Sequence, residues 1–179
     1  MLITPVDDTN NLFYVENVYP STLIDNIQQE KLLEYEYIKQ ERQQHSPRRR
    51  LIYDDVSSFS KIDKFLSENI NTISKGIGKK LSHSDTSIWI DEPGFSMGIH
   101  LDNPGVGIAM QIYLNKGPKE MGTKFYHKND INMLRYDFPY KLNCGYIMIN
   151  NDDHQWHGFP LKVPNHTYRL SAYTYFHIV

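Results

Sequence analysis

The sequence lacks the features that define several common classes of protein. It holds a single cysteine, Cys144, so no internal disulfide can form and we expect a reducing compartment. It has no run of 18 apolar residues, and its N-terminus lacks the basic and apolar blocks of a secretory signal. With a formal net charge of −2, it also lacks the basic excess of a general nucleic-acid-binding protein. We therefore expect a cytoplasmic protein without a membrane segment or a nucleic-acid partner.

The aromatic residues that are present favour strands over a helical bundle. The chain of 179 residues carries 13 Tyr, 8 Phe and 2 Trp, and its length suits one domain over residues 1–179. From residue 87 onward, seven or eight short β-rich segments alternate with turns. This spacing predicts a sandwich or barrel over residues 87–177.

Residues 1–86 are predicted to support this β core with a strand at residues 12–18 and two helices. The first helix starts at Pro20-Ser21, and the second starts with the capping-box pattern Ser60-x-x-Asp63 and carries an apolar stripe as far as Ile77. We expect the second helix to lie on the outer face of a sheet. Residues 31–43 are charged and fit either a helix or a loop.

A run of three arginines, Arg48, Arg49 and Arg50, invites interpretation as a phosphate site. Because the run is short and the whole chain is slightly acidic, the sequence favours a solvated loop edge instead.

One short pattern, His-x-Asp, contains residue types that bind metals. In His100-Leu101-Asp102, one residue separates the two side chains, so on an extended strand both point to the same face. A second copy, His83-Ser84-Asp85, lies in the polar run 82–87, which predicts a loop. We therefore reject His83 and Asp85 as ligands.

Iron(II) in oxygen-activating enzymes is often held by two histidines and one carboxylate, with open positions left for reactants. The third ligand must come from a strand remote in sequence, and His157 is the candidate. His154 lies three residues earlier, so on an extended segment it should point to the opposite face.

The last predicted strand, from His166 to Phe176, places Arg169, Ser171, Tyr173 and Tyr175 on one face. An arginine within a strand is costly to bury unless it meets an anion, and a guanidinium can grip a carboxylate with two hydrogen bonds. The alternatives are an arginine paired with an internal Asp or Glu, or one on a solvated face.

Taken in order, several motifs resemble the 2-oxoglutarate/Fe(II)-dependent dioxygenases, specifically the prolyl 4-hydroxylase-like branch. The resemblance covers roughly residues 87–176 and implies a double-stranded β-helix, a jelly-roll and cupin-like fold with N-terminal helices on its outer face. The branch has a Tyr in the segment corresponding to residues 91–94, which is absent here, although Trp89 lies near. The motifs that carry the resemblance are His100-Leu-Asp-Asn-Pro, Ile112-Tyr-Leu-Asn115, Gly122-Thr-x-Phe125, Trp156-His157-Gly158 and Arg169-x-Ser171.

The resemblance implies that His100, Asp102 and His157 bind Fe(II) and that Arg169 binds the distal carboxylate of 2-oxoglutarate. Tyr113 would help to hold that carboxylate, and Ser171 would assist. The implied reaction consumes 2-oxoglutarate and O2, hydroxylates a substrate and releases succinate and CO2, with ascorbate as an auxiliary reductant.

Two other functions stay open at this point. A metal-dependent cupin-type enzyme would use the metal without 2-oxoglutarate, and a binding module would use neither. Within the resemblance, the expected substrate is a prolyl or other protein side chain, with a small molecule as the other possibility, since fold analogy is a poor guide to substrate.

Overall fold

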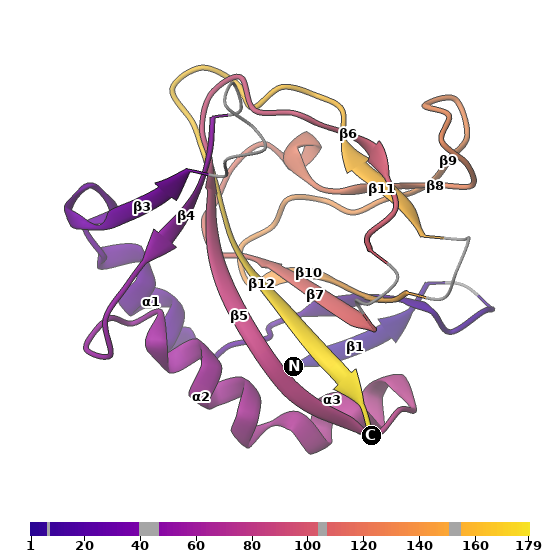
Figure 1. The fold of residues 1–179 in the computed structure, drawn as a ribbon, viewed down its shortest axis with the longest axis horizontal. Helices are drawn as coiled ribbons and strands as arrows, with labels where there is room; N and C mark the ends of the chain where they lie inside the picture. The colour runs from indigo at the N-terminus through magenta and orange to yellow at the C-terminus, as the bar shows by residue number, and fades with distance from the viewer. Residues whose placement is uncertain (7, 40–46, 104–106, 151–154) are drawn as a thin grey trace.

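The computed structural model describes residues 1–6, 8–39, 47–103, 107–150 and 155–179. Within these residues, strands form antiparallel sheets of eight and four strands that face each other, with helices outside the larger sheet (Figure 1). This mainly β arrangement confirms the predicted jelly-roll fold with helices on the outer face.

The strands are β1 Leu2–Pro5, β2 Leu12–Glu16, β3 Glu36–Lys39, β4 Arg48–Ile52, β5 Leu81–Asp91, β6 Met97–His100, β7 Ile108–Tyr113, β8 Lys124–Tyr126, β9 Leu134–Asp137, β10 Cys144–Ile149, β11 Trp156–Phe159 and β12 Arg169–Ile178. The helices are α1 Ser21–Gln29, α2 Ser60–Glu68 and α3 Ile70–Ile77, with short 3-10 turns η1 Leu32–Glu34 and η3 Lys119–Met121.

The larger sheet combines strands from both halves of the chain, in the order β1-β2-β10-β7-β12-β5-β4-β3. The long strands β5 and β12 pair along almost their whole length, and β12 also pairs with β7 on its other side. Every residue of β7 and β10 is buried, which explains why these segments read as nearly continuous apolar runs. The smaller sheet has the order β6-β11-β8-β9 and carries two of the predicted metal ligands, His100 in β6 and His157 in β11.

The helices bury their apolar stripes against the outer face of the larger sheet (Figure 1). In α1 the buried residues are Leu23, Ile24 and Ile27, as the sequence spacing predicts. The second predicted helix is divided into α2 and α3 at Asn69, whose side-chain amide donates to the carbonyl of Phe65 (2.9 Å).

The residues that begin and end this helical segment agree with the sequence pattern to different degrees. Its predicted capping box is wrong: the N-cap is Phe59, and the Ser60 hydroxyl instead donates to the carbonyls of Asp55 and Ser57. At the other end, Gly78 takes a left-handed conformation (φ 68°) that favours glycine and terminates α3.

Two stretches differ from the sequence-based expectation. Residues 31–39 form η1 and the edge strand β3 rather than a helix or plain loop. The polar run 82–87 lies within β5 rather than in a loop, because its polar side chains have partners: Thr86 bonds the buried Thr174 (2.9 Å), and His83 contacts Ser67 (3.2 Å). Of the residues considered in the sequence, His154 falls outside the described part of the chain. No helix in the described part of the chain combines the length and apolar character needed to cross a bilayer.

Candidate functional site

Two of the predicted ligands face each other across antiparallel strands. β6 pairs with β11 so that His100 lies directly opposite His157, and their ring centroids are 4.4 Å apart. Gly158 permits this close pairing, because a Cβ at that position would lie 2.7 Å from the carbonyl oxygen of Gly98. The glycine of the Trp156-His157-Gly158 motif therefore allows the two strands to approach.

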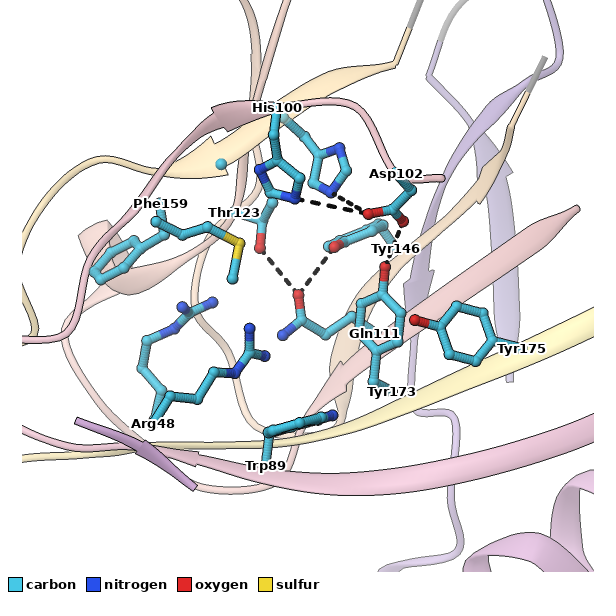
Figure 2. Close-up of a pocket in the computed structure, with 14 residues that line it drawn as sticks. Arg48, Trp89, His100, Asp102, Gln111, Thr123, Tyr146, Phe159, Tyr173 and Tyr175 are labelled. Carbon is cyan, nitrogen blue, oxygen red and sulfur yellow. Dashed lines mark hydrogen bonds and ion pairs between the residues drawn. The ribbon is translucent and has the colours of Figure 1, made fainter. Parts of the chain in front are cut away.

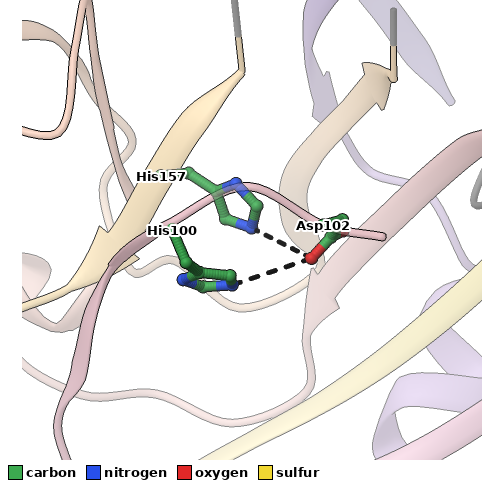
Figure 3. Close-up of side chains that lie close together, drawn as sticks. All are labelled: His100, Asp102 and His157. Atoms are coloured by element: carbon green, nitrogen blue, oxygen red, sulfur yellow. Dashed lines mark ion pairs between the residues drawn. The ribbon is translucent and has the colours of Figure 1, made fainter. Parts of the chain in front are cut away.

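Asp102, just after β6, turns its carboxylate toward both rings (Figure 3). Its Oδ1 lies 3.6 Å from Nε2 of His100 and 3.7 Å from Nε2 of His157. One potential ligand atom from each of the three residues lies within 4.8 Å of the others. Two imidazole nitrogens and one carboxylate oxygen on one side of a site form a donor set that suits Fe(II) and leaves further positions open.

The hydrogen bonds of the two imidazoles set which nitrogen is free. Nδ1 of His100 lies 2.9 Å from the carbonyl of Gly98, and Nδ1 of His157 lies 2.8 Å from the carbonyl of Gln155. A carbonyl only accepts, so in each neutral ring the proton must be on Nδ1 and the lone pair on Nε2. Both lone pairs are thus available on the side facing Asp102, and the residues present fit a bound divalent metal.

The pKa shifts of His157 and Asp102 also suit metal binding. Burial lowers the pKa of His157, which keeps that imidazole neutral. Burial alone would raise the pKa of Asp102, but the nearby His100 and His157 outweigh it, so the pKa falls and the carboxylate stays ionised. Burial would likewise lower the pKa of His100, but the nearby Asp102 carboxylate raises it overall.

Tyr173 of β12 holds the other oxygen of the Asp102 carboxylate. Its hydroxyl donates to Oδ2 at 2.9 Å, so Oδ1 is left to face the histidines. Burial raises the pKa of Tyr173 well above its ordinary value, so the phenol remains a neutral donor. The Tyr173 side chain therefore orients a predicted ligand through the second oxygen of its carboxylate.

The triad lies in the wall of a cavity of about 130 Å³ between the two sheets (Figure 2). Gln111 occupies the middle of the cavity, with Arg48 to one side and Tyr173 and Tyr175 to the other. Trp89 lies on the side opposite the triad. Arg169 also lines the cavity, together with Tyr173 and Tyr175 from the same face of β12.

Arg169 is buried and pairs with an internal carboxylate, which was one of the alternatives left open by the sequence. Its Nη1 donates to Oδ2 of Asp91 at 3.1 Å, and its guanidinium carbon lies 4.4 Å from the centre of the Phe159 ring. Asp91 also forms an ion pair with Arg48, whose Nε lies 3.0 Å from Oδ1. The prediction of a solvated loop edge is therefore wrong for Arg48, which lies in β4 and reaches the cavity.

Tyr113 and Ser171, the other predicted contacts of 2-oxoglutarate, are fully buried and join a hydrogen-bond network behind the cavity. The Tyr113 hydroxyl donates to Oγ1 of Thr123 (3.1 Å), which in turn donates to Oε1 of Gln111 (3.1 Å). Nε2 of Gln111 donates to the Ser171 hydroxyl (3.0 Å), and Tyr146 donates to Oε1 (3.0 Å). Thr123 and Gln111 line the cavity, so they connect both predicted residues to it.

Sequence reasoning did not identify several residues of this site. Gln111 had a detectable signal, because it is the one strongly polar residue in the apolar run of residues 108–114. Tyr173 was placed on the correct face but given no role. Asp91 and Arg48 gave no such signal, because their pairing depends on which strands become neighbours.

No family model and no curated protein matches this chain by sequence. Solved structures do match its fold. HygX from Streptomyces hygroscopicus, crystallised with nickel and 2-oxoglutarate, has a TM-score of 0.67 at 11% identity over 96% of this chain and 84% of its own. A Trichoplax adhaerens prolyl hydroxylase, in complex with a hypoxia inducible factor peptide fragment, has a TM-score of 0.68 at 14% identity over 94% and 84%. The chain has the fold of the 2-oxoglutarate/Fe(II)-dependent oxygenases.

Structures with this oxygenase fold differ in their reactions and ligands. SnoN, an α-ketoglutarate-dependent epimerase from nogalamycin biosynthesis, matches with a TM-score of 0.69 at 11% identity over 94% of this chain and 78% of its own. HygX was also crystallised with hygromycin B. The fold of this chain thus agrees with the resemblance in its motifs, while its substrate must be argued from the site.

Proposed function

We propose that this protein is a 2-oxoglutarate- and Fe(II)-dependent dioxygenase that uses O2 to hydroxylate a substrate. The observation that carries the proposal is the convergence of His100, Asp102 and His157 in the wall of a cavity that also contains a buried arginine, Arg169. HygX, which has a similar fold, was crystallised with nickel and 2-oxoglutarate, and this supports the assignment.

Each residue of the candidate site would have a defined role. His100 and His157 would bind iron through Nε2, and Asp102 through Oδ1. Arg169 would bind the distal carboxylate of 2-oxoglutarate, with Tyr113 and Ser171 supporting it through Thr123 and Gln111. Iron held in this way would activate O2 so that one oxygen atom enters the substrate and the other enters succinate, with release of CO2.

A prolyl or other protein side chain is our proposal for the substrate, by likeness to the prolyl hydroxylases. The cavity is also lined by Trp89, Tyr173 and Tyr175, and such aromatic surfaces suit the apolar face of a ring. A metal-dependent cupin enzyme that makes no use of 2-oxoglutarate would leave Arg169 only its structural pairing with Asp91.

Thermal unfolding with Ni²⁺ and 2-oxoglutarate tests this function. A ligand at about 100 times its Kd stabilises the native state by roughly 2.7 kcal/mol. For a protein of this size that raises Tm by roughly 5–10 °C, at about 2–4 °C per kcal/mol. We expect a large shift when both ligands are present and a small one with 2-oxoglutarate alone.

Alanine substitution of His100, Asp102 or His157 should remove the joint shift and stoichiometric metal binding while the domain remains folded. His83→Ala is the matched control, because His83 belongs to the second His-x-Asp copy and contacts Ser67 rather than the triad. A joint shift that persists in the three triad variants would overturn the proposed site.

A further inference from the structure

The buried pairing of Arg169 with Asp91 raises a difficulty for the proposed function, on which this inference rests. An arginine whose charge is neutralised by an internal carboxylate is a poor receptor for another carboxylate. The side chains of Arg169 and Asp91 are 4% and 0% exposed, so solvent does little to screen their interaction.

A second arginine resolves the difficulty. Asp91 is the residue on β5 opposite Arg169 of β12, and it is also opposite Arg48 of β4. Three neighbouring strands therefore place Arg169, Asp91 and Arg48 in one row across the sheet. Arg48 is only 11% exposed in its side chain, and its Nε lies 3.0 Å from Oδ1 of Asp91, while Arg169 uses Oδ2.

In this row two guanidinium groups share one carboxylate, which leaves one positive charge in excess within the row. Aromatic rings hold both cations in place: Arg48 lies 4.6 Å from the centre of the Trp89 ring, and Arg169 lies 4.4 Å from that of Phe159. Both arginines line the same cavity as the metal triad.

We propose that Arg48 is a positioning residue that neutralises Asp91, so that Arg169 retains the positive charge needed to bind the distal carboxylate of 2-oxoglutarate. In this account Asp91 orients Arg169, and Arg48 prevents Asp91 from cancelling its charge. Arg48 acts through Asp91 rather than by touching 2-oxoglutarate.

The test is calorimetric titration of 2-oxoglutarate into anaerobic, Ni²⁺-loaded protein. Arg48→Met should weaken 2-oxoglutarate binding at least tenfold, because one arginine and one carboxylate then leave no net charge. The double variant Arg48→Met with Asp91→Asn restores one net positive charge and should bind within about threefold of the wild type. Arg48→Lys, which retains the charge, should also bind within about threefold.

Arg49→Met is the matched control. Arg49 is adjacent in β4 but pairs with Glu92 and lies 4.5 Å from the Tyr37 ring, away from the cavity. Its substitution should leave 2-oxoglutarate affinity unchanged. Ni²⁺ affinity should be unchanged in every variant, because none of these residues belongs to the triad.

Each other result would overturn the role of Arg48. An Arg48→Met variant that binds 2-oxoglutarate as tightly as the wild type would show that Asp91 needs no second partner. A double variant that remains tenfold weaker would show that Arg48 contacts the ligand or only supports the fold, and this comparison stands even where Arg48→Met alone does not fold. Wild-type protein that binds no 2-oxoglutarate would overturn the proposed function together with the role of Arg48. The two variant results above would overturn the role of Arg48 alone.

Discussion

At the scale of single residues, each predicted metal ligand has a second contact that orients it. The two histidines donate through Nδ1 to backbone carbonyls, and Asp102 accepts from Tyr173. Such outer contacts fix the tautomer and the direction of a ligand, and their loss commonly costs about 10–100-fold in metal affinity.

Tyr173→Phe is therefore expected to weaken metal binding by roughly tenfold or more while the fold is retained. The lost hydroxyl leaves Oδ2 of Asp102 without its donor, so the carboxylate can rotate away from the two imidazoles. The measurement is competitive titration of Ni²⁺ or Fe(II) against a chelator. Tyr175→Phe is the control, because its ring packs 5.2 Å from that of Tyr173 on the same strand face without that bond to Asp102. Equal metal affinity in the two variants would contradict this role.

At the scale of elements, the site depends on how closely β6 and β11 approach. Two glycines lie on these strands, but only one is crowded. A Cβ at Gly158 would meet the carbonyl of Gly98 at 2.7 Å, whereas a Cβ at Gly98 meets nothing within 4 Å. Because the close contact is with backbone, no side-chain rotation relieves it.

We expect Gly158→Ala to push β11 away from β6, separate His157 from His100, and lower both Tm and metal affinity. Gly98→Ala adds the same methyl group to the partner strand in open space and should leave metal affinity nearly unchanged. Metal titration and thermal unfolding of the two variants check this. Normal metal affinity in Gly158→Ala would show that the strand contact does not set the geometry of the site.

The sequence predicted elements well where local pattern determines structure. Apolar spacing located α1 and the buried faces of α2 and α3, and period-2 alternation placed Arg169 and Tyr173 on the same face of β12, which lines the cavity. The ordered motifs also identified three side chains that the structure brings together.

The sequence predicted less where the outcome depends on neighbours distant along the chain. Three consecutive arginines look equivalent in sequence, yet Arg48 alone meets Asp91, because β4 pairs with β5 in one particular register. In the same way, the polar run 82–87 becomes strand because partners on α2 and β12 satisfy it. The break between α2 and α3 has no signal in the apolar stripe, which continues across Asn69.

At the scale of the whole molecule, the largest apolar cluster and the candidate site occupy opposite faces of the larger sheet. The helices cover the outer face, while the cavity lies between the sheets. Overall stability and metal binding should therefore respond to different substitutions.

Ile73→Ala in α3 tests this separation. Ile73 is completely buried against the outer face, so truncation should lower the free energy of unfolding by about 2–5 kcal/mol. The metal affinity of the folded variant should remain within about twofold of the wild-type value. Such a change is small beside the tenfold change in Kd that about 1.4 kcal/mol would produce. Urea unfolding and metal titration measure the two quantities, with the exposed neighbour Thr72→Ala as control. A parallel loss of metal affinity would show that the two faces are coupled.

The most direct test of the proposed function is the dependence of 2-oxoglutarate binding on metal and on Arg169. Calorimetric titration under anaerobic conditions compares metal-free and Ni²⁺-loaded protein, each as wild type and as Arg169→Ala. If 2-oxoglutarate meets both a metal at the triad and the guanidinium of Arg169, it should bind the loaded wild type with one-to-one stoichiometry. Binding should be at least roughly tenfold weaker without metal and at least roughly tenfold weaker in loaded Arg169→Ala, since a charge-assisted pair is worth about 1.5–3 kcal/mol. Equal affinity with and without metal, or in wild type and Arg169→Ala, would contradict the account.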